Sequence, residues 1–351
     1  MRDVAIIGFD QLPNVRRTHL SDVEMVQRVI EGALKDSKVD RKRIDFWCSG
    51  SADMLVGRPF SFVSALDAIG AWPPVSESHV EMDGAWALYE AWVRLLHGDF
   101  HTSLVYCFGE ASTGDLRNVL VTQLNPYYVA PLAPDSISVA ALQAQALVDQ
   151  GKYTERDFAE VAYRNRKAAA TNEKAYLRDS DEVDTLLQEA PIVGLLRKHA
   201  CPPITDGACA VVLATREYVE ANNIEAVAWI RGFDHRIDEH DLGARDLADS
   251  PSTRIAAEKA GAKLGAIDVA ELHAPFAHQE LILRDVLGFD ASTKINPSGG
   301  CMAANSMMVA GLTRIGEAAN AIREGRAKRA LAHATSGPAL QQNLICILEA
   351  E

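Results

Sequence analysis

The pattern of hydrophobic and polar positions changes along the chain, and segments with the pattern of a strand alternate with segments with the pattern of a helix. The first apolar run ends at glycine and is typical of a strand buried on both faces, and Ser21 is placed to cap the helix that follows. Strands that alternate with helices indicate an α/β protein with a largely parallel core. The predicted elements of this part are a strand at 4–8, a helix at 21–37, a strand at 44–48, a helix at 85–96 and a strand at 103–108.

The C-terminal part repeats this order. In both parts a helix ends at glycine, a short polar turn follows, and an apolar strand enters the core. Such self-similarity predicts two copies of one α/β unit. The second series comprises a helix at 256–264, a strand at 267–273, a helix at 314–323 and a strand at 329–333.

The segment between the two copies has a different composition. Its first part, 118–134, is typical of a loop, and an acidic, turn-prone stretch lies at 179–182. We expect helices at 136–150 and 157–171, which would form a lid or a substrate-facing domain; a solvated helical excursion is the alternative. The predicted domains are an N-terminal half (1–117 and 200–222), a loop domain (118–199) and a C-terminal half (223–351).

Composition and charge exclude several other classes of protein. A length of 351 residues fits two domains or one duplicated fold, and 48% hydrophobic with 24% charged residues excludes a long disordered chain. The net charge of −13 gives no general attraction to nucleic acids or anionic lipids, and no apolar run is long enough for a membrane span. Six sparse cysteines without metal-ligand spacing favour the reducing cytoplasm and no bound metal.

Several segments, in register along the chain, resemble the thiolase superfamily, most closely its sterol-carrier-protein-type thiolases and lipid-transfer-type relatives. The resemblance implies a duplicated five-layer α-β-α-β-α core with an inserted loop domain. It also implies an acyl-CoA thioester as the substrate, with no tightly bound cofactor. The segments are Tyr153–Ala159, Cys201–Ala210, Glu271–Ala277 and the "NPSGG" stretch Asn296–Gly300.

The positions that carry thiolase chemistry are altered. A thiolase uses a nucleophilic cysteine, a histidine that activates it and a second cysteine as acid and base. Glu81 stands where the resemblance puts the nucleophile, Ser306 stands where it puts the histidine, and Thr335 and Ser336 match the second cysteine motif. A carboxylate forms no acyl thioester and a hydroxyl is a poor base near pH 7, so these residues argue against ordinary thiolysis or Claisen condensation.

What remains is a set of candidate residues. The resemblance implies that His273 contributes to an oxyanion hole, with a buried structural histidine as the alternative. Glu81, expected at the head of a buried helix, is either a general base or a helix cap. The predicted catalytic residues are His273, Glu81 and Ser306, and the predicted substrate contacts are Asn305, Gly299, Gly300, Thr335 and Ser336.

Three further residues, two histidines and a cysteine, are weaker candidates for the site. Cys301 and His278 are predicted to be packing residues. His333 lies on the strand before Thr335, where it could face the sheet packing or the site. Asn305 and Ser306 are suited to hydrogen-bond a substrate amide or hydroxyl, or form a plain turn.

Two functions follow from the resemblance. The first is an acyl-CoA-binding subunit of a carbon–carbon lyase, a retro-aldolase that acts on β-hydroxyacyl-CoA in sterol side-chain degradation. Aldolases of the family use tyrosines near the glycine-rich loop and the C-terminal turn, and this chain has no tyrosine after Tyr218. The second is a non-catalytic subunit of a heteromeric thiolase-like acyltransferase complex, with a possible OB-fold and zinc-ribbon partner.

We also expect a homodimer or heterodimer with another thiolase-like chain. The resemblance implies that the apolar strand at 103–108 pairs edge to edge with its copy, and an apolar edge left uncovered would promote aggregation.

Overall fold

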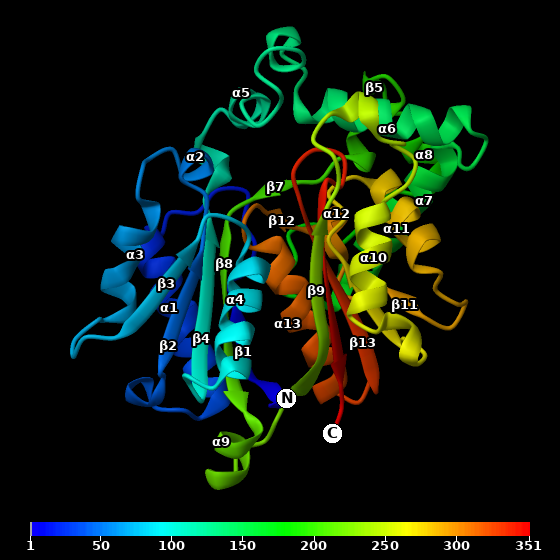
Figure 1. Cartoon of the computed structure of the whole chain (residues 1–351). Coiled ribbons are helices and arrows are strands. Elements are labelled where there is room, and N and C mark those ends of the chain that lie inside the picture. The colour runs from blue at the N-terminus through cyan, green and yellow to red at the C-terminus, as the bar shows by residue number, and fades with distance from the viewer. Residues whose placement is uncertain (1) are drawn as a thin grey trace.

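The computed structural model describes residues 2–351, and its core is one ten-stranded sheet made of two five-stranded halves (Figure 1). The strand order is β3-β2-β4-β8-β1 in one half and β11-β10-β13-β14-β9 in the other. The strands of the first half are β1 (Val4–Gln11), β2 (Phe46–Gly50), β3 (Ser76–Val80), β4 (Thr102–Gly109) and β8 (Gly207–Thr215). Those of the second are β9 (Ala228–Ile237), β10 (Val269–Leu272), β11 (Lys294–Ile295), β13 (Arg329–Ser336) and β14 (Gln342–Glu349).

The two halves have the same topology, which confirms the predicted duplication. In each half the first strand runs antiparallel to the last, while the second strand is parallel to both of its neighbours. The halves are joined where β1 pairs with β9 through Val4–Ile6 and Ala228–Ile230. The chain therefore builds one unit twice and joins the copies edge to edge.

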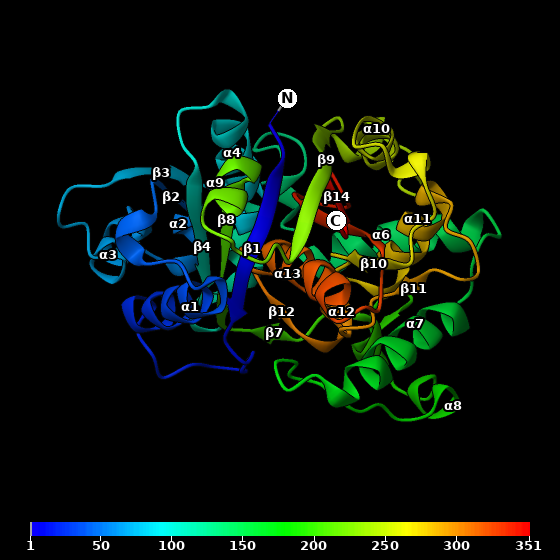
Figure 2. The ribbon, with the colours of Figure 1, turned by 90° about the horizontal axis from the view of Figure 1, so that it is seen from below.

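Helices cover the two halves in five layers. α4 (Gly84–His97) and α13 (Ala310–Arg323) form the middle layer and share one apolar core with both half-sheets (Figure 2). α1 (Asp22–Ser37) and α3 (Ser61–Ile69) cover the outer face of the first half, while α10 (Pro251–Lys259) and α11 (Ala277–Leu287) cover that of the second. α9 (Arg216–Ala221) follows β8.

Local sequence explains where these helices begin and end. Ser21 caps α1 as predicted, and Glu24 completes a capping box. α10 differs from its prediction, since it begins at Pro251 and stops at Lys259 rather than continuing to residue 264. Pro251 suits the first helical turn, and Gly261 has a φ of +77°, which ends the helix.

The chain between β4 and β8 adds no strand to the large sheet. Part of the predicted loop is helical, because Asp115 caps α5, whose hydrophobic residues lie over a cavity. The helices here are α5 (Leu116–Val121), α6 (Ser136–Asp149), α7 (Glu155–Ala168) and α8 (Val183–Leu186). Short strands form two further pairs, β5 (Pro191–Val193) with β6 (Leu196–Arg197), and β7 (Ile204–Thr205) with β12 (Asn305–Ser306).

The predicted pairing edge is wrong. β4, which contains the apolar strand at 103–108, lies between β8 and β2 and is fully buried. The outer strand of this half is β3, a polar strand with half-exposed side chains. A wholly apolar strand indicates burial between neighbours, whereas a free edge is commonly polar.

Candidate active site

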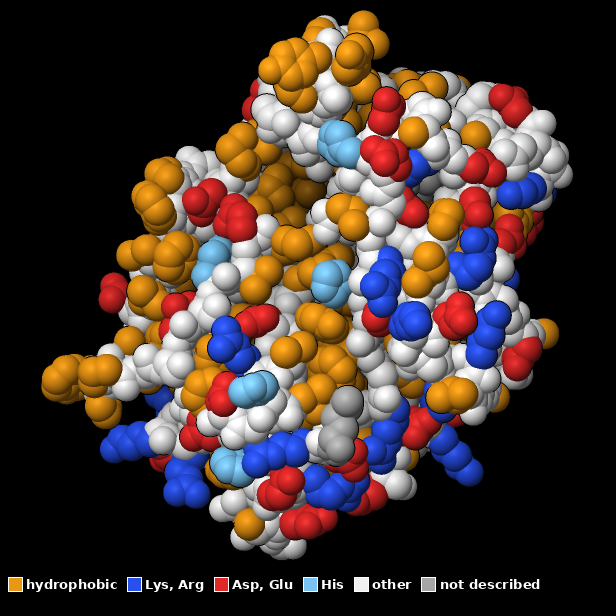
Figure 3. All heavy atoms as spheres, viewed as in Figure 1, with side chains coloured by type: hydrophobic (Ala, Val, Ile, Leu, Met, Phe, Trp, Pro, Cys, Tyr) orange, Lys and Arg blue, Asp and Glu red, His pale blue; other side chains and the backbone are white. Residues whose placement is uncertain are grey.

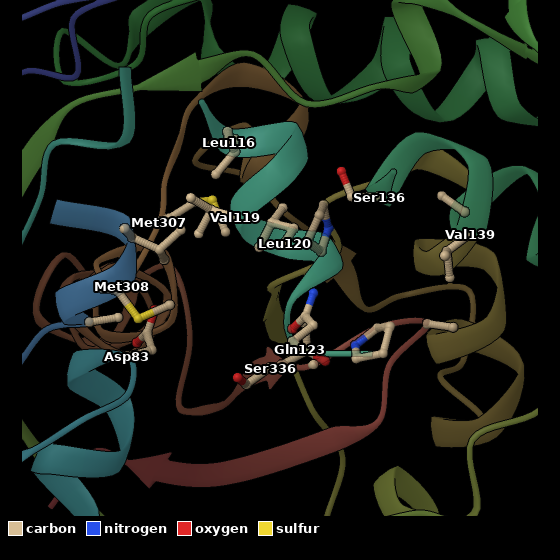
Figure 4. Close-up of a pocket in the computed structure, with 18 of the residues that line it drawn as sticks. Asp83, Leu116, Val119, Leu120, Gln123, Ser136, Val139, Met307, Met308 and Ser336 are labelled. Atoms are coloured by element: carbon tan, nitrogen blue, oxygen red, sulfur yellow. The ribbon is translucent and has the colours of Figure 1, made fainter. Parts of the chain in front are cut away.

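A cavity of about 440 Å³ opens where the two halves meet the inserted segment. Figure 3 shows it as a hollow, floored by hydrophobic side chains, below the projecting segment that carries α5. The carboxyl end of β13, the loop after β10, the start of α4 and the segment after β12 form its base, and α5 and α6 line the opposite side (Figure 4). α2 (Asp53–Val56) closes one flank. The lining is largely aliphatic, which suits an apolar ligand with a few polar contacts.

His273 lies in this lining as a neutral hydrogen-bond donor. Burial, and then the nearby His333 and Arg314, lower the pKa of His273 to about 3, so the ring carries no charge near neutral pH. The backbone N–H of Thr335 donates to Nδ1 at 3.3 Å. The ring proton is therefore on Nε2, a donor that has no protein partner among the described residues.

Glu81 also lines the cavity, but it is not the cap of α4. Its Oε1 accepts a hydrogen bond of 2.6 Å from the backbone N–H of Asp53, and Oε2 lies 3.1 Å from Nε2 of His79. The side chain is 51% exposed. These contacts hold a carboxylate at the mouth of the cavity, where it can accept a further hydrogen bond.

The cap is Asp83, a residue that the sequence analysis does not predict. This buried side chain accepts backbone N–H groups from Ala85, Gly311 and Leu312 at 2.9–3.1 Å. Burial raises the pKa of Asp83, and the three N–H groups oppose that rise. Asp83 thus joins the N-termini of α4 and α13, which both point towards the cavity. The aspartate before the glycine of a helix start was the signal that could have identified it.

Ser306 lies outside the cavity, although it was predicted to be catalytic. Its hydroxyl contacts Thr205 Oγ1 of β7 at 3.0 Å and Asn14 Oδ1, in the segment after β1, at 2.7 Å. Neighbouring residues of a strand face opposite ways, so Asn305 lines the cavity instead. Thr335 and Ser336 line it as well, with the Thr335 hydroxyl bonded to the Gln342 carbonyl.

Gly299 and Gly300 are packing residues and do not line the cavity. A Cβ on Gly299 would lie 2.5 Å from the Cβ of Ala169, and one on Gly300 would lie 2.8 Å from the Asn296 side chain. Both glycines also have positive φ. The "NPSGG" segment therefore forms a tight turn that leads into α12 (Gly300–Ala303) and does not line the cavity.

Two buried carboxylates hold that segment in place. Glu271 accepts from the backbone N–H and the hydroxyl of Ser298, and it forms an ion pair of 2.9 Å with Arg314. Glu280 accepts from the Asn296 amide at 2.9 Å and pairs with Arg164 of α7. The motif thus fastens the inserted segment to the C-terminal half.

No described cysteine lines the cavity. Cys301 is buried on α12, and burial raises the pKa of its thiol to about 12, which excludes a ready thiolate. His278 is also buried and bonds Gln143 at 3.1 Å, while His333 bonds Asn343 at 2.9 Å behind His273. All three are packing residues here. Residues 2–351 contain no cluster of His, Cys, Asp or Glu suited to a metal ion, and none of their helices is long and apolar enough to cross a membrane.

The chain is similar in structure to thiolases. The crystal structure of human mitochondrial 3-ketoacyl-CoA thiolase in complex with CoA superposes with a TM-score of 0.79 and 17% identity, over 100% of this chain and 98% of that one. This likeness shows that the chain has the thiolase fold. No protein-family model matches the sequence.

Sequence similarity points the same way. The acetyl-CoA acetyltransferase of Methanocaldococcus jannaschii is 25% identical, over 90% of this chain and 89% of that protein. Sterol carrier protein 2 of Oryctolagus cuniculus is 27% identical, over 53% of this chain and 39% of that protein. These similarities support a place for the chain in the thiolase superfamily.

Proposed function

We propose that this chain binds an acyl-CoA thioester and takes part in carbon–carbon bond cleavage without forming an acyl-enzyme. The observation that carries the proposal is the neutral His273, whose Nε2–H is free in a cavity with no cysteine among its described lining residues. Such a donor stabilises the oxyanion of a thioester enolate and contributes ~3–4 kcal/mol. The likeness to a thiolase solved with CoA supports the ligand class.

The reaction is a retro-aldol cleavage of a β-hydroxyacyl-CoA. Glu81 takes the proton of the β-hydroxyl, and that oxygen forms a carbonyl as the Cα–Cβ bond breaks. The electron pair of the broken bond moves into the thioester enolate, whose oxygen His273 holds by a hydrogen bond. Protonation of Cα then releases a shortened acyl-CoA beside the carbonyl product. Atoms and electrons balance with no oxidant, metal or tightly bound cofactor.

The substrate is a bulky apolar acyl group, such as the side chain of a sterol in degradation. The cavity lining supports this assignment, because α5, α6 and the methionines after β12 supply mostly aliphatic surface. Methionines adapt their shape to irregular ligands. Asn305, Thr335 and Ser336 are the polar contacts for the thioester end and the hydroxyl.

A second function is a partner subunit of a heteromeric thiolase-like acyltransferase complex, which another thiolase-like chain and an OB-fold, zinc-ribbon protein would complete. Two observations favour it. The Ser306 hydroxyl is bonded to Thr205 and Asn14 outside the cavity lining, so the residue that the resemblance puts in place of the activating histidine does not face the cavity. The outer edge of β3 has no strand partner among residues 2–351, and Phe60 at the start of α3 and Trp72 just before β3 are exposed.

Cleavage assays separate the two functions. The purified chain, alone and coexpressed with the products of neighbouring genes, is incubated with β-hydroxyacyl-CoA thioesters, and the shortened acyl-CoA and carbonyl product are quantified by mass spectrometry. Cleavage by the chain alone is the result expected of a lyase. Cleavage that needs a partner, and that Glu81→Gln and His273→Ala in this chain leave unchanged, would assign the chemistry to the partner.

A further inference from the structure

A line of hydrogen bonds leads from the cavity into the edge of the sheet through His79, a residue with no part in the mechanism above. Nε2 of His79 lies 3.1 Å from Glu81 Oε2, and Nδ1 lies 2.9 Å from the hydroxyl of Ser49. The sheet fixes this line: Ser49 of β2 is the register partner of His79 on β3, and Glu81 follows two residues later. Ser49 is buried, so only Glu81 reaches the cavity.

The imidazole of His79 is held far more firmly than that of a surface ion pair. Both ring nitrogens have partners, the side chain is 14% exposed, and the ring stacks on Phe62 with centroids 4.6 Å apart. For comparison, His97 pairs with Asp99 at 3.0 Å, but its side chain is 76% exposed. A donor fixed at three points can orient a carboxylate, whereas an exposed pair contributes little.

We infer that His79 is the positioning residue for Glu81 in the proton-transfer step, a role that rests on the proposed function. Its Nε2–H and the backbone N–H of Asp53 fix one oxygen each, which turns the remaining lone pairs of the carboxylate towards the cavity. Ser49 holds the ring in the plane that this hydrogen bond needs. The other charged groups around His79 are Glu77 and Asp53, and the carboxylate of Asp53 is occupied by the backbone of Phe60 and Ser61.

The proton balance closes within this arrangement. Glu81 receives the β-hydroxyl proton and becomes neutral. The Nε2–H of His79 donates to the same oxygen of Glu81 before and after this transfer. After the Cα–Cβ bond has broken, the same proton is available for Cα of the enolate. His79 touches neither substrate nor product, so its loss is expected to lower kcat and not to raise KM.

Kinetics of two variants test the role in whichever form of the protein, chain or complex, cleaves β-hydroxyacyl-CoA. His79→Leu should lower kcat by ~10²-fold with KM changed less than threefold, since the base is misplaced. His79→Gln keeps an N–H donor, so its kcat should be at least about fivefold higher than that of His79→Leu. His97→Gln, in the exposed pair, is the matched control and should leave kcat unchanged. A cleaving enzyme indifferent to His79→Leu would overturn the positioning role alone.

A second measurement needs no activity. In protein labelled with ¹⁵N-histidine, the hydrogen bond to Glu81 should protect the Nε2–H of His79 from exchange and give a resolved signal, which Glu81→Ala abolishes. A signal that survives Glu81→Ala would overturn the inference whatever the protein catalyses. A signal that depends on Glu81, in a protein that cleaves no β-hydroxyacyl-CoA alone or in complex, would overturn the proposed function and the role of His79 with it.

Discussion

At the scale of single residues, the site depends on which way a few side chains face. His273 contributes one N–H, and the backbone of Thr335 decides that this hydrogen sits on Nε2. Asn305 and Ser306 are adjacent in β12, and only Asn305 lines the cavity. Which side chains can reach a ligand in the cavity therefore depends on orientation as well as on residue type.

Removal of the His273 donor should slow enolate formation. We expect His273→Ala to lower the rate of deuterium exchange at Cα of a saturated acyl-CoA in D₂O by ~10²–10³-fold, because the oxyanion loses its preorganised donor. The exchange is followed by mass spectrometry of the acyl-CoA. His240→Ala, which removes an exposed histidine, is the control. Equal exchange rates in the wild-type protein and His273→Ala would mean that His273 is structural.

Residue types and family positions led to His273 and Glu81, but not to the orientation of Ser306 or the presence of His79. Ser306 was misplaced because a strand of two residues gives no periodicity from which to assign a facing direction. His79 was missed because its strand is almost entirely polar, so no hydrophobic alternation marks it. The glycines of the "NPSGG" segment were predicted to contact substrate because they match the motif of the family. Tight packing and positive φ instead explain why glycine stands at these two positions.

At the scale of elements, the sheet was predictable and the inserted segment 118–199 was only partly so. Short apolar runs, the first of them closed by glycine, predicted β1 and β4, because a short continuous apolar run is typical of a strand buried on both faces. α5 was missed as a helix because it has only six residues, and none of them is fully buried. A helix with so few buried contacts is expected to open more readily than the core.

We expect α5, which lines the cavity, to control which acyl groups bind. Val119 lies on the cavity face of α5, so Val119→Trp should fill part of the cavity and weaken binding of long or branched acyl-CoA by at least tenfold, with acetyl-CoA affected less. Val121→Trp, on the same helix but outside the cavity lining, is the matched control. Calorimetric titration measures both. Similar losses for all acyl lengths in both variants would contradict the placement of the acyl chain.

At the scale of the whole molecule, two half-sheets share a core that buries several polar side chains. Histidines 273, 278 and 333 are buried and uncharged, since burial lowers their pKa values to about 3, 3 and 4. His273 lines the cavity, and His278 joins this interior to α6 through its bond with Gln143.

These histidines should make the fold sensitive to acid. Their folded pKa values lie below the ordinary value of 6.5, so the unfolded chain takes up protons first. The stability they confer is complete above pH 6.5 and is lost as the pH falls towards 4, by about 1.4 kcal/mol per pH unit for each histidine. Urea unfolding at pH 7 and 5.5 measures the loss. His278→Gln should make the loss of unfolding free energy smaller by about 1.4 kcal/mol per pH unit. An unchanged loss would show that His278 does not contribute.

The outer strand β3 should mediate assembly. Phe60 at the start of α3 and Trp72 in the turn that leads into β3 expose apolar surface, with Trp72 86% exposed. Trp72→Glu should weaken a dimer, formed with a second copy or with a related chain, by at least tenfold in Kd, as measured by light scattering after size exclusion. Leu264→Glu, at an equally exposed apolar position in the C-terminal half, is the control. A dimer unaffected by Trp72→Glu would place the interface elsewhere.

The central claim is that the chain handles acyl-CoA thioesters without becoming acylated. Intact-mass spectrometry of the protein, at intervals after mixing with acetyl-CoA, acetoacetyl-CoA or a β-hydroxyacyl-CoA, tests it most directly. The account predicts an unchanged protein mass at every time point, because no described cysteine lines the cavity and burial keeps the Cys301 thiol protonated. A stoichiometric acyl adduct on any cysteine would contradict the account.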